Sequence, residues 1–148
     1  MRSLIVVALL CLFSAAYGYT DSGSLTIDAK SAYCYYYDSS SVSVSNMNTW
    51  INGTSNNLYG YISVYASPSD SLGLTSTTLA ICSPNQGNHN ECSTQSIQFT
   101  YSNSVETTYI FVCMECHYWF GPCIFDEYNV ALTNSAPQEG YVDCSFCH

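Results

Sequence analysis

The residues best suited to chemistry in this chain are cysteines, and two closely spaced pairs are each followed by a histidine. Cys113-Met-Glu-Cys116-His117 and Cys144-Ser-Phe-Cys147-His148 have the spacing of zinc knuckles, in which thiolates hold a tetrahedral ion. The same spacing occurs in thioredoxin-like redox sites, where a helix N-terminus lowers the pKa of one thiol. Nothing helical precedes either pair, which disfavours the redox alternative. The choice between zinc and disulfides depends on the compartment.

The N-terminus predicts export. Met1 and Arg2 give a basic start, residues 4–13 form an apolar run, and Ala16-Tyr17-Gly18 is a small-x-small cleavage site. This is the layout of a secretory signal peptide, and the run is short for a membrane span. We therefore expect residues 1–18 to be removed and residues 19–148 to form one domain with a cysteine-rich C-terminal tail. The mature chain is expected outside the cell or on its surface, with no membrane span.

In an oxidising compartment the cysteines are expected in disulfides rather than on zinc. Cleavage removes Cys11 and leaves an even number, which suits a fully paired framework. Proximity favours Cys82–Cys92 and Cys116–Cys123, while the remaining pairings stay open. Bridges from the last pair would fix a tail that lacks a strand pattern. The cysteines of the mature chain are Cys34, Cys82, Cys92, Cys113, Cys116, Cys123, Cys144 and Cys147.

The charge of the chain excludes two classes of partner. It carries 2 Lys and Arg residues against 11 Asp and Glu residues, a formal net charge of −9, and cleavage leaves Lys30 as the one lysine or arginine. Nucleic-acid phosphates and anionic lipid surfaces are bound by clusters of basic side chains, so neither is expected as a partner. No cofactor is predicted. On charge alone, these carboxylates suit calcium better than zinc.

No catalytic residues are predicted. His89, His117 and His148 are the side chains that could act as bases at neutral pH, and none stands in a nucleophile motif. Asp126 and Glu127 are adjacent carboxylates, but neighbours in a strand point to opposite faces. A glycosidase needs two carboxyls that face each other across the scissile bond. The chain is therefore expected not to be an enzyme.

A glycosylation sequon stands at Asn52-Gly53-Thr54. Asn-Gly is a turn-forming pair, so we expect the acceptor Asn52 to be exposed in a turn between two strands. In a eukaryotic secretory pathway Asn52 would then carry an N-linked glycan.

The elements that must position these residues are strands. Apolar and polar residues alternate at a period of two in short runs separated by loop-forming sequences such as Asn52-Gly53 and residues 84–88. We expect an all-β fold, an antiparallel two-sheet β-sandwich or jelly roll stapled by disulfides. The expected strands lie near residues 25–29, 33–37, 42–44, 58–66, 78–82, 96–101, 107–113 and 128–133.

The chain holds 14 tyrosines, and their alternation predicts two faces. In the run 58–66, Leu58 and the even positions 62–66 would face the core, while Tyr59, Tyr61 and Tyr65 would face the other side. β-propensity and amphipathic rings at the wet edges of sheets are the favoured explanation of such a pattern, and an exposed contact surface is the alternative. The apolar loop 119–122 is also open to two interpretations: it would be a contact site if exposed and a plug of the core if buried. The expected contact residues are Tyr35, Tyr37, Tyr59, Tyr61, Tyr65 and Trp119.

Two segments resemble a known family. The stretch Glu106-Thr-Thr-Tyr-Ile-Phe-Val112, followed by Tyr128-Asn-Val-Ala-Leu-Thr133, resembles the closing hairpin of the bacterial pre-peptidase C-terminal domain family, and Leu58-Tyr-Gly-Tyr-Ile-Ser-Val-Tyr65 resembles its Leu-Tyr strand. The resemblance implies a small non-catalytic jelly roll appended to secreted enzymes. Asn56-Asn57 replace the acidic residues of the family, and the cysteines lie outside its pattern, so no ligand residues carry over.

These observations favour a non-catalytic secreted structural or adhesive component of an extracellular surface, matrix or filament assembly. Residues 62–66 and 109–113 are low-charge windows of high β-propensity, able to accept a partner strand from a second copy or another extracellular protein. Lysine, which commonly protects edge strands, is almost absent. The alternative function is a carbohydrate-binding module that uses exposed tyrosine and tryptophan rings.

Overall fold

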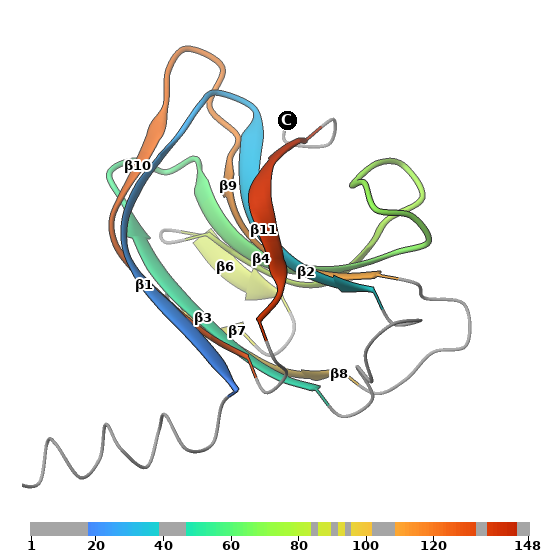
Figure 1. Ribbon diagram of the computed structural model, residues 1–148. Helices are drawn as coiled ribbons and strands as arrows, with labels where there is room; N and C mark the ends of the chain where they lie inside the picture. The colour runs from blue at the N-terminus through green and yellow to red at the C-terminus, as the bar shows by residue number, and fades with distance from the viewer. Residues whose placement is uncertain are drawn as a thin grey trace, which may run out of the picture.

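The structure is a computed structural model that describes residues 18–38, 47–83, 86–89, 92–93, 96–101, 109–132 and 136–144. Strands and no helices occur in these ranges, and they form two antiparallel sheets that face each other (Figure 1). The expected antiparallel sandwich is therefore confirmed. The predicted signal before residue 18, the expected strand at 42–44, and Cys147 and His148 lie outside the described residues.

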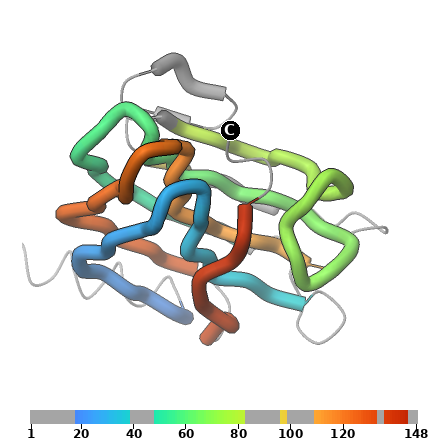
Figure 2. Tube along the Cα trace, turned by 90° about the horizontal axis from the view of Figure 1, so that it is seen from above, coloured from blue at the N-terminus to red at the C-terminus, as the bar shows by residue number. Residues whose placement is uncertain are grey.

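The first sheet joins five strands in the order β1-β10-β3-β8-β7, and the second joins six in the order β11-β2-β9-β4-β5-β6. The chain changes sheets repeatedly, so segments distant in sequence lie side by side (Figure 2). The strands are β1 (Tyr19–Ile27), β2 (Ser31–Asp38), β3 (Met47–Ser55), β4 (Gly60–Ser67), β5 (Thr77–Ser83), β6 (Gln86–His89), β7 (Cys92–Ser93), β8 (Ser96–Tyr101), β9 (Tyr109–Cys116), β10 (Cys123–Leu132) and β11 (Gln138–Asp143).

The main core lies between the sheets and follows from the period of two. On β4, Ile62, Val64 and Ala66 point inward as predicted, and Phe125 on β10 packs into the same cluster. Each such side chain stabilises the fold by about 1.5–3 kcal/mol when fully buried. Leu58 does not follow the prediction. It precedes β4, in the turn after β3, and is 49% exposed.

A second apolar cluster lies on the other side of the second sheet. Tyr65 and Phe111 point there from β4 and β9, and they are covered by Leu72 from the segment between β4 and β5. Cys34 and Cys113 belong to the same cluster. The central strands of this sheet are therefore buried on both faces, which is unlike the one-sided burial of the expected pattern.

Disulfides join strands within and between the sheets. Cys34–Cys113 links the neighbours β2 and β9, and Cys116–Cys123 links β9 of the second sheet to β10 of the first. The predicted Cys116–Cys123 pair is confirmed. Cys82 and Cys144 are also disulfide-bonded. The side chain of Cys92 lies outside the described part, so the predicted Cys82–Cys92 pair stays a prediction. Because the sulfurs of Cys113 and Cys116 are bonded to two different partners, this CxxC is not a zinc knuckle.

Several strand predictions were wrong where pairing overrides local turn chemistry. The predicted turn at Asn52-Gly53 lies inside β3, between β10 and β8. A Cβ at Gly53 would stand 3.2 Å from the Phe125 ring, so the absence of a side chain there permits the close approach of that ring. β1 begins at Tyr19 rather than near residue 25, β6 occupies part of the predicted loop at 84–88, and the predicted tail contains β11, which pairs with β2.

The two segments expected to accept a partner strand are interior. β4 lies between β9 and β5, and β9 lies between β2 and β4, so their backbone groups are already paired. Addition of a strand at residues 62–66 or 109–113 is therefore not available in this fold. Two of the four described outer strands, β1 and β11, carry acidic side chains, Asp21 on β1 and Glu139 and Asp143 on β11, and charges disfavour edge-to-edge association at these two edges.

Candidate binding surface

The structure separates the predicted contact residues into buried and exposed sets. Tyr35 and Tyr37 are buried because they point from β2 into the space between the sheets, and Tyr65 is buried beneath Leu72. These three are not surface residues, and the prediction was wrong for them. Tyr61 is half-buried. Tyr59 is 44% exposed and Trp119 is 61% exposed.

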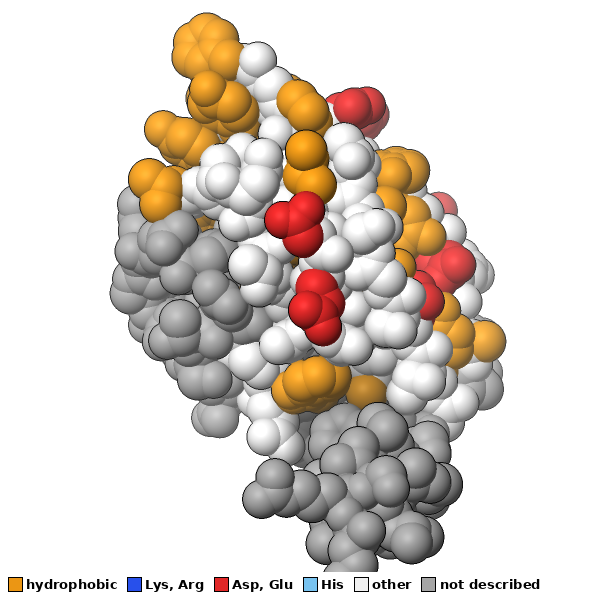
Figure 3. Space-filling view, turned by 90° about the vertical axis from the view of Figure 1, so that its left-hand side faces the viewer, with side chains coloured by type: hydrophobic (Ala, Val, Ile, Leu, Met, Phe, Trp, Pro, Cys, Tyr) orange, Lys and Arg blue, Asp and Glu red, His pale blue; other side chains and the backbone are white. Residues whose placement is uncertain are grey.

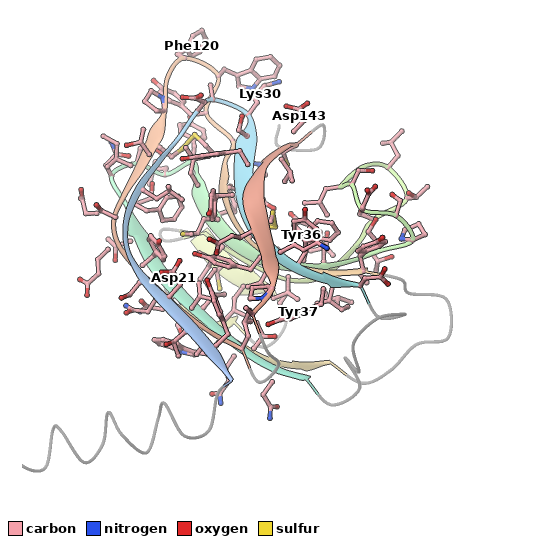
Figure 4. All side chains as sticks on the ribbon, in the orientation of Figure 1. Asp21, Lys30, Tyr36, Tyr37, Phe120 and Asp143 are labelled. Atoms are coloured by element: carbon pink, nitrogen blue, oxygen red, sulfur yellow. A yellow bond between two sulfur atoms is a disulfide. The ribbon has the colours of Figure 1, made fainter. Side chains whose placement is uncertain are left out.

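The exposed pair belongs to a larger apolar surface at one end of the sandwich, which we call the aromatic tip. Phe120 is its most exposed ring, at 90%, and it stands at the upper end of the molecule in Figure 4. Two loops form the surface, the turn from β3 to β4 and the loop from β9 to β10. In the space-filling view, hydrophobic side chains gather at the same end (Figure 3). The aromatic tip comprises Leu58, Tyr59, Tyr118, Trp119, Phe120 and Ile124.

Backbone and covalent contacts hold the two loops together. The Cys116–Cys123 disulfide closes the loop from β9 to β10 at its base. The backbone N–H of Asn56 donates to the Ile124 carbonyl at 2.9 Å, and the Ile124 N–H donates to Oδ1 of Asn56 at 2.9 Å. The rings of Tyr59 and Tyr118 stack with centroids 4.9 Å apart. These contacts reduce the conformational entropy that the tip would lose on binding.

Lys30 adds a positive charge to the tip. It lies in the turn from β1 to β2, where its φ of 56° and a hydrogen bond from Ser31 N–H to the Asp28 carbonyl (3.1 Å) define a tight reversal. The turn places its ammonium over the Trp119 ring, and Figure 4 shows Lys30 at the same end as Phe120. A cation over an indole face is attracted by the ring quadrupole. The one lysine or arginine of residues 19–148 therefore contacts the tip.

A buried carboxylate supports the tip from the second sheet. Glu115 on β9 is fully buried, and Ser63 Oγ donates to its Oε1 at 2.7 Å. His117 Nε2 lies 2.7 Å from its Oε2. Burial and the neighbouring Glu115 carboxylate raise the pKa of Tyr65. The backbone N–H of His117 donates to the Tyr59 carbonyl at 2.8 Å, which connects this network to the tip.

The network borders a pocket of about 300 Å³ between the second sheet and the segment from β4 to β5. A carboxylate bound to an imidazole is the arrangement that orients a catalytic histidine. Here, however, Ser63 donates to the carboxylate rather than to His117, which is not the order that activates a serine nucleophile. The pocket is lined by Tyr65, Gly73, Leu74, Ser76, Thr78, Ile81 and His117.

Sequence reasoning missed Glu115. The sequence feature that could have identified it is a single acidic residue at an outward position of an apolar strand, followed two residues later by a histidine on the same face. Such an acid looks exposed by alternation, and only the covering of the outer face of the second sheet buries it. Of the other histidines, His148 and the side chain of His89 lie outside the described part of the chain.

The acidic residues Asp126, Glu127 and Asp21 do not come together in one site. Asp126 and Glu127 are both exposed, because a bulge in β10 between Phe125 and Glu127 interrupts the alternation. Asp21 accepts hydrogen bonds from Tyr35 (2.6 Å) and Tyr128 (3.3 Å), where it bridges the two sheets. Burial, followed by the bond to Asp21, raises the pKa of Tyr35. Within the described ranges, no group of three or more His, Cys, Asp or Glu side chains is placed to hold a metal ion.

The fold and the tip define a disulfide-bonded antiparallel β-sandwich with an exposed aromatic end. Comparison with protein-family models, with curated proteins and with solved structures gave no match. No helix long and apolar enough to cross a membrane occurs in the described ranges.

Proposed function

We propose that this protein is a secreted, non-catalytic recognition module, an adhesive component of an extracellular surface or matrix that contacts its partner through the aromatic tip. The observation that carries the proposal is the exposure of Trp119 (61%) and Phe120 (90%) on loops held by a disulfide and a ring stack. Tryptophan and other aromatic side chains supply large contact areas at protein interfaces, and a rigid loop loses little entropy when it binds.

The partner that fits this surface is another extracellular protein with an apolar socket and a basic rim. Apart from the Lys30 ammonium over Trp119, the tip is apolar, whereas the chain as a whole is acidic, with a formal net charge of −9. Equal charge opposes association between copies of this chain, and opposite charge on a partner speeds encounter. The proposed adhesion is therefore between different proteins.

A carbohydrate partner is the second candidate, and one observation favours it. The Tyr59 ring, 44% exposed, is held by stacking on the half-buried Tyr118 ring at an interplanar angle of 14°, and Trp119, which follows Tyr118 in the chain, is 61% exposed. Flat rings of this kind pack against the apolar faces of sugars. The two candidates share the same surface, so they are distinguished by the chemistry of the partner.

The test measures binding of the labelled mature protein to the native cell-surface and matrix fraction of the cells that express it. We expect Trp119→Ser with Phe120→Ser to weaken binding by at least about tenfold, the loss typical of interface hot spots. Leu74→Ser is the matched control, because Leu74 is fully exposed, apolar and outside the tip. Equal losses in both variants would contradict the proposal.

Treatment of the surface fraction then identifies the partner. Protease digestion is expected to abolish binding, and periodate oxidation of glycans is expected to leave it unchanged. The reverse outcome would replace the protein partner with a carbohydrate at the same tip. Binding that survives both treatments and both tip substitutions would remove the aromatic tip from consideration.

A further inference from the structure

The outer face of the first sheet places the sequon beside a tryptophan. On β3, Thr49 and Ile51 are buried, so Trp50, Asn52 and Thr54 point outward from alternate positions. Residues two apart on one strand face lie about 6–7 Å from each other. The side chains of Trp50 and Asn52 are therefore neighbours, and both are half-buried.

The amide of Asn52 is oriented by a neighbouring strand. Asn129 stands opposite Asn52 in the register of β10 and β3, and its Nδ2 donates to Oδ1 of Asn52 at 3.1 Å. This bond uses the amide oxygen, whereas an N-linked glycan is attached through the nitrogen. The Trp50 indole is held in a similar way, because its Nε1 donates to Ser96 Oγ at 3.1 Å.

The surroundings suit a sugar. Ser22 and Ser96 share the cross-strand row of Asn52, and Ala131 and Gln98 share the row of Trp50. These neighbours are uncharged. Among the described residues on the side of the molecule seen in Figure 3, the surface is mainly uncharged, with a few acids and no lysine or arginine.

We infer that Asn52 carries an N-linked glycan whose first N-acetylglucosamine packs on the indole of Trp50 and covers the outer face of the first sheet. The transfer forms a bond between Asn52 Nδ2 and C1 of the sugar. It breaks the bond from C1 to oxygen of a lipid-linked diphosphate donor, which leaves, and it releases one amide proton. The inference rests on the secretion included in the proposed function, but it does not involve the aromatic tip.

The first experiment is the intact mass of the chain secreted by eukaryotic cells, before and after peptide N-glycosidase. A mass loss is expected for the wild type and not for Thr54→Ala, which keeps Asn52 but destroys the sequon. A wild-type chain secreted without the glycan overturns the inference. Loss of tip binding in the preceding assay would leave this result unaffected, so the two proposals fail separately.

The second experiment tests the contact with Trp50. The urea midpoint is compared between glycosylated chain and Asn52→Gln, in the wild-type, Trp50→Leu and Trp119→Leu backgrounds. We expect the stabilisation by the glycan to be lost with Trp50→Leu and kept with Trp119→Leu, the matched control at the tip. Equal stabilisation in all three backgrounds would overturn the contact.

A fluorescence measurement covers the case in which Trp50→Leu fails to fold. In a Trp119→Phe background, Trp50 is the only tryptophan. The glycosylated chain should then show weaker acrylamide quenching than the same chain with Asn52→Gln. Identical quenching would show that no sugar covers the indole.

Discussion

Glu115 is the residue with the most demanding environment in the described structure. Its side chain is fully buried, Ser63 and His117 contact its two oxygens at 2.7 Å, and Tyr65 lies beside it. A buried carboxylate is tolerated only when its hydrogen bonds are satisfied. The network therefore stabilises the junction between the second sheet and the aromatic tip, and it does so with polar groups rather than apolar packing.

The first residue-scale prediction concerns this carboxylate. Glu115→Ala leaves the Ser63 hydroxyl and the His117 imidazole without their acceptor, and we expect it to lower the free energy of unfolding by about 3–5 kcal/mol. Urea denaturation measures the change. Glu139→Ala is the control, because Glu139 is exposed and its hydrogen bond with Tyr19 lies at the surface. Comparable losses for the two variants would contradict the assignment of a structural role to burial of Glu115.

At the scale of elements, the two described disulfides have different structural roles. Cys34–Cys113 joins residues separated by 79 positions and links adjacent strands in the middle of the second sheet. Cys116–Cys123 joins residues separated by 7 positions and closes the loop that carries Trp119 and Phe120. Loop closure restricts the unfolded chain more when the loop is long. The first bridge should therefore dominate stability, and the second should dominate the order of the tip.

The element-scale prediction follows from this difference. In the loop-entropy model, replacing Cys34 and Cys113 by serine should cost about 4–5 kcal/mol, and replacing Cys116 and Cys123 about 2–3 kcal/mol. Urea denaturation of the two double variants gives these values. At a temperature where both stay folded, only the Cys116 and Cys123 variant should bind the surface fraction more weakly. Equal binding by both variants would show that the bridge does not order the tip.

At the scale of the whole molecule, the tyrosines connect the layers. Tyr35 bridges the sheets through Asp21, Tyr19 donates to Glu139 on β11 at 2.8 Å, and Tyr65 lies between the second sheet and Leu72. Burial is the main cause that raises the pKa of each of these three phenols. The heavy use of tyrosine is therefore largely structural, since the rings fill apolar space while the hydroxyls of Tyr19 and Tyr35 donate to carboxylates of neighbouring strands.

The whole-molecule prediction is a dependence of stability on alkaline pH. Because the folded pKa of Tyr35 and Tyr65 is raised above the unfolded value of about 10, the folded chain keeps its phenol protons longer than the unfolded chain. The free energy of unfolding should be steady below about pH 9 and fall as pH rises above about 10. The double variant Tyr35→Phe with Tyr65→Phe should lose stability at neutral pH and show a shallower alkaline decline. An unchanged slope in urea denaturation would contradict the assignment.

The sequence by itself determined the all-β class and the inward side of strands such as β4, since a period of two is a local property of the chain. It predicted the antiparallel sandwich and the Cys116–Cys123 bridge, and it included Tyr59 and Trp119 among six candidate contact residues without deciding which of them are exposed. Alternation placed Ile62 and Val64 on one face of β4 and Tyr65 on the other, which the structure confirms.

The tertiary structure decided which sheet faces and which strand edges are exposed to solvent. Tyr65 is buried because Leu72 covers it, on a face that alternation alone leaves open, and Glu115 on the same sheet is buried in contact with Ser63 and His117. Residues 62–66 are protected because β9 and β5 pair with β4 on both sides. Asn52-Gly53 lies in a strand because β10 and β8 supply backbone partners that a turn would forgo. The local sequence pattern specifies which secondary structure a residue prefers and which side of a strand it takes. Strand pairing and the burial of a sheet face depend on segments that are distant in the chain.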